Sequence, residues 1–235
     1  MTKRGAAVTE ALVRGMALGK SYRRGVERVD ALRSASFMLV PGEVVALVGP
    51  SGSGKSTLLG VLCGWEVPDA GELAWSGWMD VTTAAAIPWS RLAIVPQALG
   101  LIEDLSIAEN VALPVRLGPG SRNGRPVGDP RRTARVGYLM ELFRVQHLAD
   151  RLPDECSLGE QQRAAVARAL VLEPDLVLAD EPTAHQDAGF ARTVFRALRD
   201  AAHDGAACLV ATHNRDGLRY ADRVFHLTDG ALTEE

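Results

Sequence analysis

A run of nine residues from Gly49 to Thr57 combines glycines, hydroxyls and one lysine, and it directly follows the apolar segment 44–48. Glycine permits backbone dihedral angles that turn successive N–H groups inward, so such a loop can surround an anion. A helix that begins near Lys55 adds the positive end of its dipole to the same place. The pattern therefore predicts a phosphate-binding loop for a nucleoside triphosphate.

The residue types within this loop predict distinct contacts. Lys55 supplies a point charge to the outer phosphates, and Ser56 places a hydroxyl where it can ligate a magnesium ion that bridges them. A Gly/Ser-rich linker is the alternative interpretation, but linkers do not lie between a buried strand and an apolar helical segment. The other loop positions expected to bind the nucleotide are Gly49, Ser51, Gly52, Ser53, Gly54 and Thr57.

Two acids follow a second apolar segment, residues 176–179. Paired acids also occur at surface turns, but the carboxyl ends of strands in an open α/β sheet face the ligand crevice. In a chain with a phosphate loop, Asp180 is therefore expected to hold the magnesium ion, directly or through water. Glu181 is expected to orient and polarise the water that attacks the γ-phosphate.

A third motif, at residues 156–163, precedes an apolar helical run that ends at Leu170. Ser157 and Glu160 have the spacing of a capping box, which by itself indicates only a well-capped helix start. A serine, a glycine and exposed N–H groups at a helix N-terminus also form an anion site. The motif thus has a second interpretation, a grip on a phosphate from the opposite side.

The elements that position these motifs alternate between β-rich and helical segments, which favours a parallel sheet wrapped by helices. Between residues 98 and 156 the pattern is helical, so an insertion of helices is expected there. Within it, residues 117–130 are rich in Gly and Pro and predict an exposed loop. The predicted buried strands are Val44–Val48, Leu92–Val95, Leu176–Ala179 and Cys208–Thr212.

The motifs and their order resemble the ATP-binding cassette (ABC) ATPases, and the resemblance covers nearly the whole chain. Residues 156–163 are similar to the signature motif of that family. Tyr22 is at the position of the aromatic residue that stacks on adenine, and Asp187 fits the aspartate of the D-loop. Gln97 fits the glutamine that touches magnesium and relays movement to a membrane partner, and His213 fits the switch histidine near the γ-phosphate.

This resemblance implies a complete set of site residues. The catalytic residues would be Lys55, Gln97, Glu181 and His213, and the metal ligands would be Ser56, Gln97 and Asp180. Besides the phosphate loop, the nucleotide would contact Tyr22, Ser157, Gly159, Glu160 and Asp187.

The resemblance also implies a fold and an assembly. The fold would be a P-loop NTPase, with a RecA-like parallel-sheet core, an N-terminal antiparallel β subdomain and an inserted helical subdomain. The chain would be one ATPase domain, residues 1–235, with the core and β subdomain in 1–97 and 158–235 and the helical subdomain in 98–157. Two subunits would close head to tail on ATP and Mg²⁺ and drive a transmembrane permease from the cytoplasmic face of the membrane.

The segment 101–114 resembles the corresponding stretch of the lipoprotein-release and macrolide-export subfamily. The same subfamily includes a cell-division ATPase that signals across the membrane, so transport and mechanical signalling both stay open. The identity of the cargo would reside in the permease.

Two positions depart from the family pattern. Leu158 stands where the family has glycine, so a bulky side chain enters a place of close backbone approach. Residues 184–187, Ala-His-Gln-Asp, replace the commoner Ser-Ala-Leu-Asp. The Leu158 change predicts slow turnover in a homodimer or unequal sites in a heterodimer, unless a slight shift of the helix tolerates it.

Composition limits the other classes of function. A net charge of -3 offers no basic excess for binding nucleic acid. The three cysteines are widely spread, which predicts neither disulfides nor a metal site. No signal peptide or membrane span is expected. The sequence has no guanine-reading element, which argues against a GTPase switch. It has one cassette, whereas a translation factor of this type would have two. It also lacks a sustained heptad pattern, which argues against a chromosome or DNA-repair ATPase with coiled-coil arms.

Overall fold

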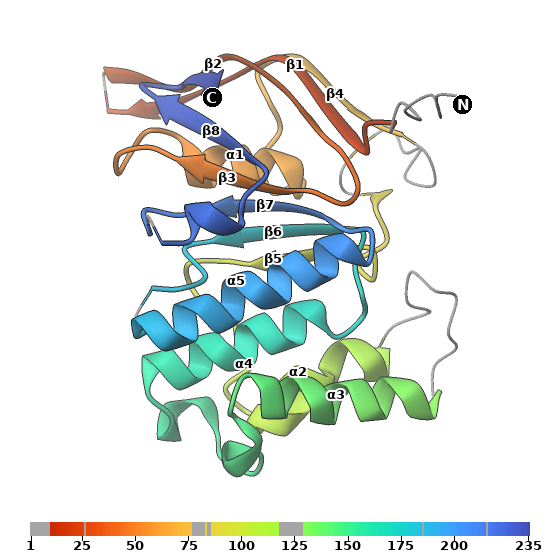
Figure 1. The fold of residues 1–235 in the computed structure, drawn as a ribbon. Helices are drawn as coiled ribbons and strands as arrows, with labels where there is room; N and C mark the ends of the chain where they lie inside the picture. Colours follow the sequence, from red (N-terminus) through yellow and green to blue (C-terminus); the bar gives the residue numbers. More distant parts are fainter. Residues whose placement is uncertain are drawn as a thin grey trace, which may run out of the picture.

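The computed structural model describes residues 10–235 apart from residues 26, 77–82, 84, 85, 118–128, 185 and 215. Within these limits the chain forms two sheets and a set of helices arranged in layers (Figure 1). Most of the predicted loop at 117–130 lies outside the described residues. His185, in the segment that resembles the D-loop, also lies outside them. Leu117 and Pro130, the two ends of that predicted loop, belong instead to flanking helices.

The smaller sheet is antiparallel and has the strand order β2-β1-β4. Its strands are β1 (Val13–Arg24), β2 (Glu27–Leu39) and β4 (Ala70–Trp75). Ala35, Phe37 and Leu39 alternate with exposed residues along β2 and are buried, as expected for a strand with one face on the core. The predicted N-terminal antiparallel subdomain is confirmed.

The larger sheet has six strands in the order β5-β6-β7-β3-β8-β9. The first five are parallel to their neighbours, and the last pairs antiparallel with β8. Every residue of β6 and β7 is buried, which is typical of parallel strands covered on both faces. The strands are β3 (Val44–Val48), β5 (Leu92–Val95), β6 (Leu176–Asp180), β7 (Ala207–Ala211), β8 (Arg223–Thr228) and β9 (Ala231–Glu234).

The helices are divided between the two faces of this sheet. The helix α1 (Lys55–Leu62) packs on the face that also meets the smaller sheet, whereas α4 (Leu158–Leu170) and α5 (Ala188–His203) cover the other face (Figure 1). The helices α2 (Ile107–Leu117) and α3 (Pro130–Leu142) lie beyond α4, with which both are in contact. The described residues also include the short 3₁₀ helices η3 (Gln146–Leu148), η4 (Pro153–Glu155) and η5 (Leu218–Tyr220).

Alternate residues of a central strand point to opposite faces of the larger sheet and belong to two different hydrophobic cores. In β6, Leu176 and Leu178 belong to the core shared with α1, and Val177 and Ala179 to the core shared with α4 and α5. Burying one such leucine or valine stabilises the fold by roughly 1.5–3 kcal/mol, so the strand is fixed on both sides. Its carboxyl end, where Asp180 and Glu181 follow, therefore has a fixed position.

Two strand boundaries differ from the sequence prediction. The strand predicted at 208–212 runs from Ala207 to Ala211, and β6 extends one residue beyond Ala179. Thr212 follows the last residue of β7, and its backbone N–H still donates to the carbonyl oxygen of Leu47 in β3 at 3.1 Å. Its hydroxyl accepts a hydrogen bond from the backbone N–H of Asn214 at 3.0 Å.

Candidate nucleotide-binding site

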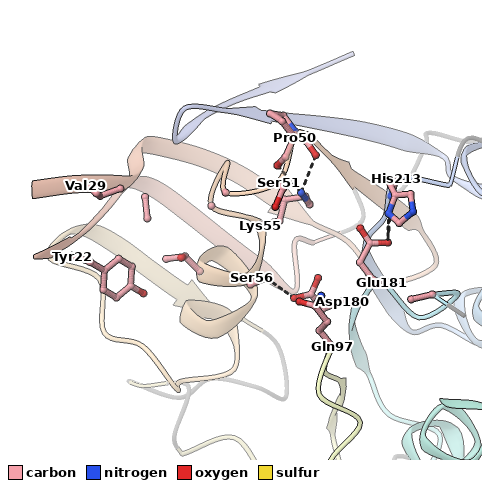
Figure 2. Close-up of a pocket in the computed structure, with 16 residues that line it drawn as sticks. Tyr22, Val29, Pro50, Ser51, Lys55, Ser56, Gln97, Asp180, Glu181 and His213 are labelled. Atoms are coloured by element: carbon pink, nitrogen blue, oxygen red, sulfur yellow. Dashed lines mark hydrogen bonds and ion pairs between the residues drawn. The ribbon is translucent and has the colours of Figure 1, made fainter. Parts of the chain in front are cut away.

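A pocket of about 670 Å³ opens at the carboxyl ends of β3 and β6 and against the smaller sheet (Figure 2). It brings together residues that are far apart in the sequence and that were predicted to bind nucleotide or metal. The predicted residues that line it are Tyr22, Gly49, Ser51, Gly52, Gly54, Lys55, Ser56, Thr57, Gln97, Asp180, Glu181 and His213.

The phosphate loop requires glycine at two of its positions for steric reasons. A Cβ atom at Gly49 would lie 2.1 Å from the carbonyl oxygen of Leu227, and one at Gly54 would lie 2.1 Å from that of Ala31. Gly54 also has a φ angle of 108° and is the N-cap residue of α1. Both glycines allow the loop to lie directly on β8 and β2.

The loop continues into α1 at Lys55, whose Nζ donates to the carbonyl oxygens of Gly49 and Pro50 at 2.9 and 3.0 Å. The ammonium group is thereby held at the mouth of the loop (Figure 2). Ser53 does not line the pocket. Its hydroxyl is buried, and its backbone N–H donates to the carbonyl oxygen of Pro50 at 3.2 Å.

The predicted metal ligands meet between α1 and β6. The Oγ atom of Ser56 donates to Oδ2 of Asp180 at 2.6 Å, and Gln97 lines the same pocket (Figure 2). Hydroxyl, carboxylate and amide oxygens are hard donors of the type that Mg²⁺ prefers, and this ion binds through few protein ligands together with substrate phosphates. This set of donors fits a magnesium ion held on a nucleotide.

Glu181 faces a different direction from Asp180 because the chain turns sharply after β6. Its φ angle is 50°, in the left-handed region. Its Oε2 atom lies 2.9 Å from Nδ1 of His213 and accepts from the backbone N–H of His213 at 3.4 Å. The Glu181 side chain is largely buried, at 15% exposure, whereas that of His213 is 78% exposed. The carboxylate is therefore held in place, and the exposed imidazole that it contacts lines the pocket, where it can reach a ligand.

At the end of the pocket away from His213, the lining residues belong to the smaller sheet (Figure 2). Tyr22 on β1 is paired with Val29 on β2, and both line the pocket together with Ala31. Tyr22 is 38% exposed, and the Nζ atom of Lys20 lies 5.5 Å from the centroid of its ring. An exposed aromatic face beside apolar residues suits the stacking of a base.

The signature residues are not part of this pocket. Ser157 is the N-cap of α4 and forms a capping box with Glu160, in which the Ser157 backbone N–H donates to Oε2 of Glu160 at 2.8 Å. The hydrogen bond from the Ser157 backbone, followed by that from its hydroxyl, lowers the pKa of the Glu160 carboxyl. The predicted capped helix start is confirmed, and Leu158 is exposed at the first position of the helix.

Asp187 lies beside the signature motif and also outside the pocket. It caps α5, accepting from the backbone N–H of Phe190 at 2.8 Å. The neighbouring Gln186 donates through Nε2 to the carbonyl oxygen of Gly159 at 2.7 Å. Ser157, Gly159, Glu160 and Asp187 thus form a second group, separate from the residues that line the pocket.

One residue near the site has no role in the sequence prediction. Gln162 is 2% exposed, and its Nε2 atom donates to the carbonyl oxygen of Glu181 at 2.8 Å. It shares a helical face with the buried Ala165 and Val166, at spacings of three and four residues. This periodicity indicates a buried glutamine, although it does not reveal the partner.

The fold and the site together define a P-loop nucleoside triphosphatase. The chain belongs to the ABC transporter family, whose model matches residues 32–184. It is therefore the ATP-binding and ATP-hydrolysing subunit of a transporter.

Among curated proteins, the chain is similar to two called "Lipoprotein-releasing system ATP-binding protein LolD". The one from Gluconobacter oxydans is 41% identical over 222 residues, 92% of each chain. The one from Maricaulis maris is 40% identical over 225 residues, 92% of this chain and 94% of its own. The predicted resemblance to the lipoprotein-release subfamily is confirmed.

Among solved structures, the chain resembles the ATP-binding cassette MJ0796 in a dimeric post-hydrolysis state bound to ADP and Pi. The TM-score is 0.83 at 30% identity, and the match covers 95% of this chain and 97% of that one. A second dimeric structure of MJ0796, a bacterial ABC transporter cassette, has the same TM-score at 29% identity and the same coverage. The predicted fold class is confirmed. In the described part of this chain, no helix is long and apolar enough to cross a membrane.

Proposed function

We propose that this chain hydrolyses Mg²⁺-bound ATP in a head-to-tail dimer and that closure of the dimer drives a separate membrane permease. The observation that carries the proposal is the division of the predicted residues into two groups. One pocket holds the phosphate loop with Asp180, Glu181 and His213, while the signature residues lie outside it.

The pocket accounts for binding of the nucleotide. Tyr22 offers a face on which adenine stacks, and the backbone N–H groups of the loop surround the phosphates. Lys55 adds a positive charge at the mouth of the loop, next to the N-terminal end of α1. Ser56, Asp180 and Gln97 would hold magnesium, which would supply charge neutralisation at the outer phosphates.

Hydrolysis needs a group that orients water and accepts its proton. Glu181 has the geometry for this role, because its carboxylate is fixed at 2.9 Å from His213 and lies beside Asp180. His213 is exposed to the pocket and can contact the γ-phosphate. Oε2 of Glu181 contacts Nδ1 of His213, so a change in one side chain alters the orientation of the other.

The signature residues need a second subunit to reach a nucleotide. Ser157, Gly159, Glu160 and Asp187 lie outside the pocket of their own chain, at the N-terminal ends of α4 and α5. Each helix end presents backbone N–H groups that attract phosphate. The dimeric state of the MJ0796 structures supports an arrangement in which these ends cover the pocket of the partner.

The membrane side of the proposal is supported by the relatives. Two proteins that are about 40% identical are called lipoprotein-releasing system ATP-binding proteins. We therefore assign this chain to the cytoplasmic face of the membrane, bound to a permease that exports or releases lipoproteins. The division into a core with β subdomain (1–97 and 158–235) and a helical subdomain (98–157) is part of the same proposal.

The experiment is purification of the tagged chain from detergent-solubilised membranes, with the Lys55→Ala variant as a control for nucleotide dependence. The preparation should contain a permease with transmembrane segments and release phosphate from ATP in the presence of Mg²⁺. Association with ribosomes or DNA and no permease would contradict the proposal, as would a preparation without ATPase activity.

A further inference from the structure

Gln162 is buried and polar, and packing alone does not explain why a glutamine occupies this position. Its Oε1 atom is buried and has no hydrogen-bond partner among the described residues. A buried amide oxygen without a partner is destabilising, so an apolar side chain of the same length would fill this space better. What the glutamine adds is the hydrogen bond of 2.8 Å from Nε2 to the main-chain carbonyl of Glu181.

That carbonyl belongs to a turn that needs support. A φ angle of 50° at Glu181 is unfavourable for a residue with a side chain and persists only where the surroundings hold it. The Glu181 N–H donates to Ala211 at 2.9 Å, and its carbonyl accepts from the N–H of Ala184 at 3.0 Å. Gln162 adds to these two backbone bonds a third that comes from a side chain.

We infer that Gln162 is a positioning residue that holds the turn at Glu181 and so aims the catalytic carboxylate. The inference rests on the proposed role of Glu181 as the group that activates water. Reversing the Gln162 amide would place Oε1 against the Glu181 carbonyl oxygen, which is repulsive, so the orientation with Nε2 toward Glu181 is the favourable one.

The same residue connects the two halves of the site within one chain. The helix α4 begins with the signature residues Ser157 and Gly159, and Gln162 lies about one turn further along it. In the proposed dimer, this helix end contacts the partner's nucleotide. Gln162 therefore joins the helix that carries the signature residues to the turn at the chain's own Glu181 through one hydrogen bond.

The test is the Gln162→Met variant, which keeps the length and loses the donor. Because a displacement of about 1 Å at a reacting group can cost up to ~100-fold in rate, kcat for ATP should fall roughly 10- to 100-fold. The KM and the affinity for nucleotide should change by less than about twofold. Gln146→Met, the same exchange at an exposed residue of η3, should leave all three values unchanged.

A second measurement separates positioning from a general role in folding. The Gln162→Met change is combined with Glu181→Gln, and dimer formation with MgATP is followed by size-exclusion chromatography. The combined variant should form the ATP-dependent dimer as Glu181→Gln alone does. If Gln162→Met is not folded at the assay temperature, Gln162→Asn, which keeps an amide but is one methylene too short, replaces it in both experiments.

A folded Gln162 variant with wild-type kcat would overturn the inference, as would a loss of nucleotide affinity or of the dimer in proportion to the loss of rate. Failure of the proposed function gives a different result. In that case Glu181→Gln itself would hydrolyse ATP at near the wild-type rate, whatever the behaviour of Gln162→Met.

Discussion

Ser56 Oγ and Asp180 Oδ2 form a hydrogen bond of 2.6 Å across 124 positions of the sequence. The pairing of β6 with β7 and of β7 with β3 brings the carboxyl ends of β3 and β6 to one edge of the sheet. The first turn of α1 then meets the end of β6. This contact is the place where the phosphate loop and the acidic strand end meet to form a single site.

Asp180→Asn should weaken magnesium binding and reduce ATP hydrolysis at low Mg²⁺ by tenfold or more, because it removes a charged ligand while keeping the shape. The measurement is phosphate release over a Mg²⁺ titration. Removal of the metal with EDTA should abolish turnover in the wild type. An unchanged Mg²⁺ dependence in the variant would exclude Asp180 as a ligand.

Lys55→Ala should reduce the affinity for ATP. The lost interaction is a hydrogen bond to a charged group, worth about 1.5–3 kcal/mol, which corresponds to roughly a 10- to 150-fold rise in Kd. Isothermal titration with ATP measures this change. If both affinity and hydrolysis are unchanged, the phosphate loop has been assigned incorrectly.

Leu158→Gly should increase the ATPase activity of the assembled complex several-fold, because glycine lets the signature backbone approach the γ-phosphate more closely. Leu158 is 57% exposed, so its removal leaves no cavity in the core. Steady-state turnover with the permease present is the measurement. A decrease in a variant that retains its thermal stability would show that the leucine is an accommodated part of the site.

The capping box at α4 predicts an acid-sensitive part of the stability. The pKa of Glu160 is lowered in the folded state, first by the backbone N–H of Ser157 and then by its hydroxyl. A lowered carboxyl pKa stabilises the fold above the ordinary glutamate value of 4.5 and loses this effect as the pH falls through the folded-state value. Urea unfolding of Glu160→Gln should therefore depend less on pH below 4.5 than that of the wild type.

The same helix end can be tested at neutral pH. Ser157→Ala should lower the free energy of unfolding by about 1 kcal/mol, since it removes the N-cap acceptor of α4. Equal stability of the variant and the wild type in urea would show that the cap contributes nothing to the fold.

The parts of the fold that sequence patterns predict well are those where one local rule decides. Val44–Val48 and Leu92–Val95 are strands with the predicted bounds, because short apolar runs between turn signals become buried parallel strands. The sequence patterns do not locate the two long strands β1 and β2. The pairing of β1 with β2 has register shifts between Gly15 and Ser21, and they interrupt the alternation of buried and exposed residues that would identify β1. In β2 a regular alternation covers only the last part of the strand, from Ala35 to Leu39.

The site shows the same division between local and tertiary information. The phosphate loop and the pair Asp180 and Glu181 can be predicted from the sequence because each is one continuous segment. The left-handed backbone at Glu181 cannot be predicted in this way, since no glycine marks the position. Its hydrogen bond from Gln162 depends on how α4 packs against the end of β6. Such contacts arise only when the sheet and its helices are assembled.

The most direct test of the account is Glu181→Gln, studied by phosphate release and by size-exclusion chromatography with MgATP. The substitution keeps the shape and the hydrogen bonding but removes the charge that polarises the attacking water. Binding should survive while hydrolysis stops, so the variant should accumulate as a closed dimer that the wild type forms only transiently. Hydrolysis at near the wild-type rate would show that Glu181 is not the catalytic carboxylate and would contradict the mechanism.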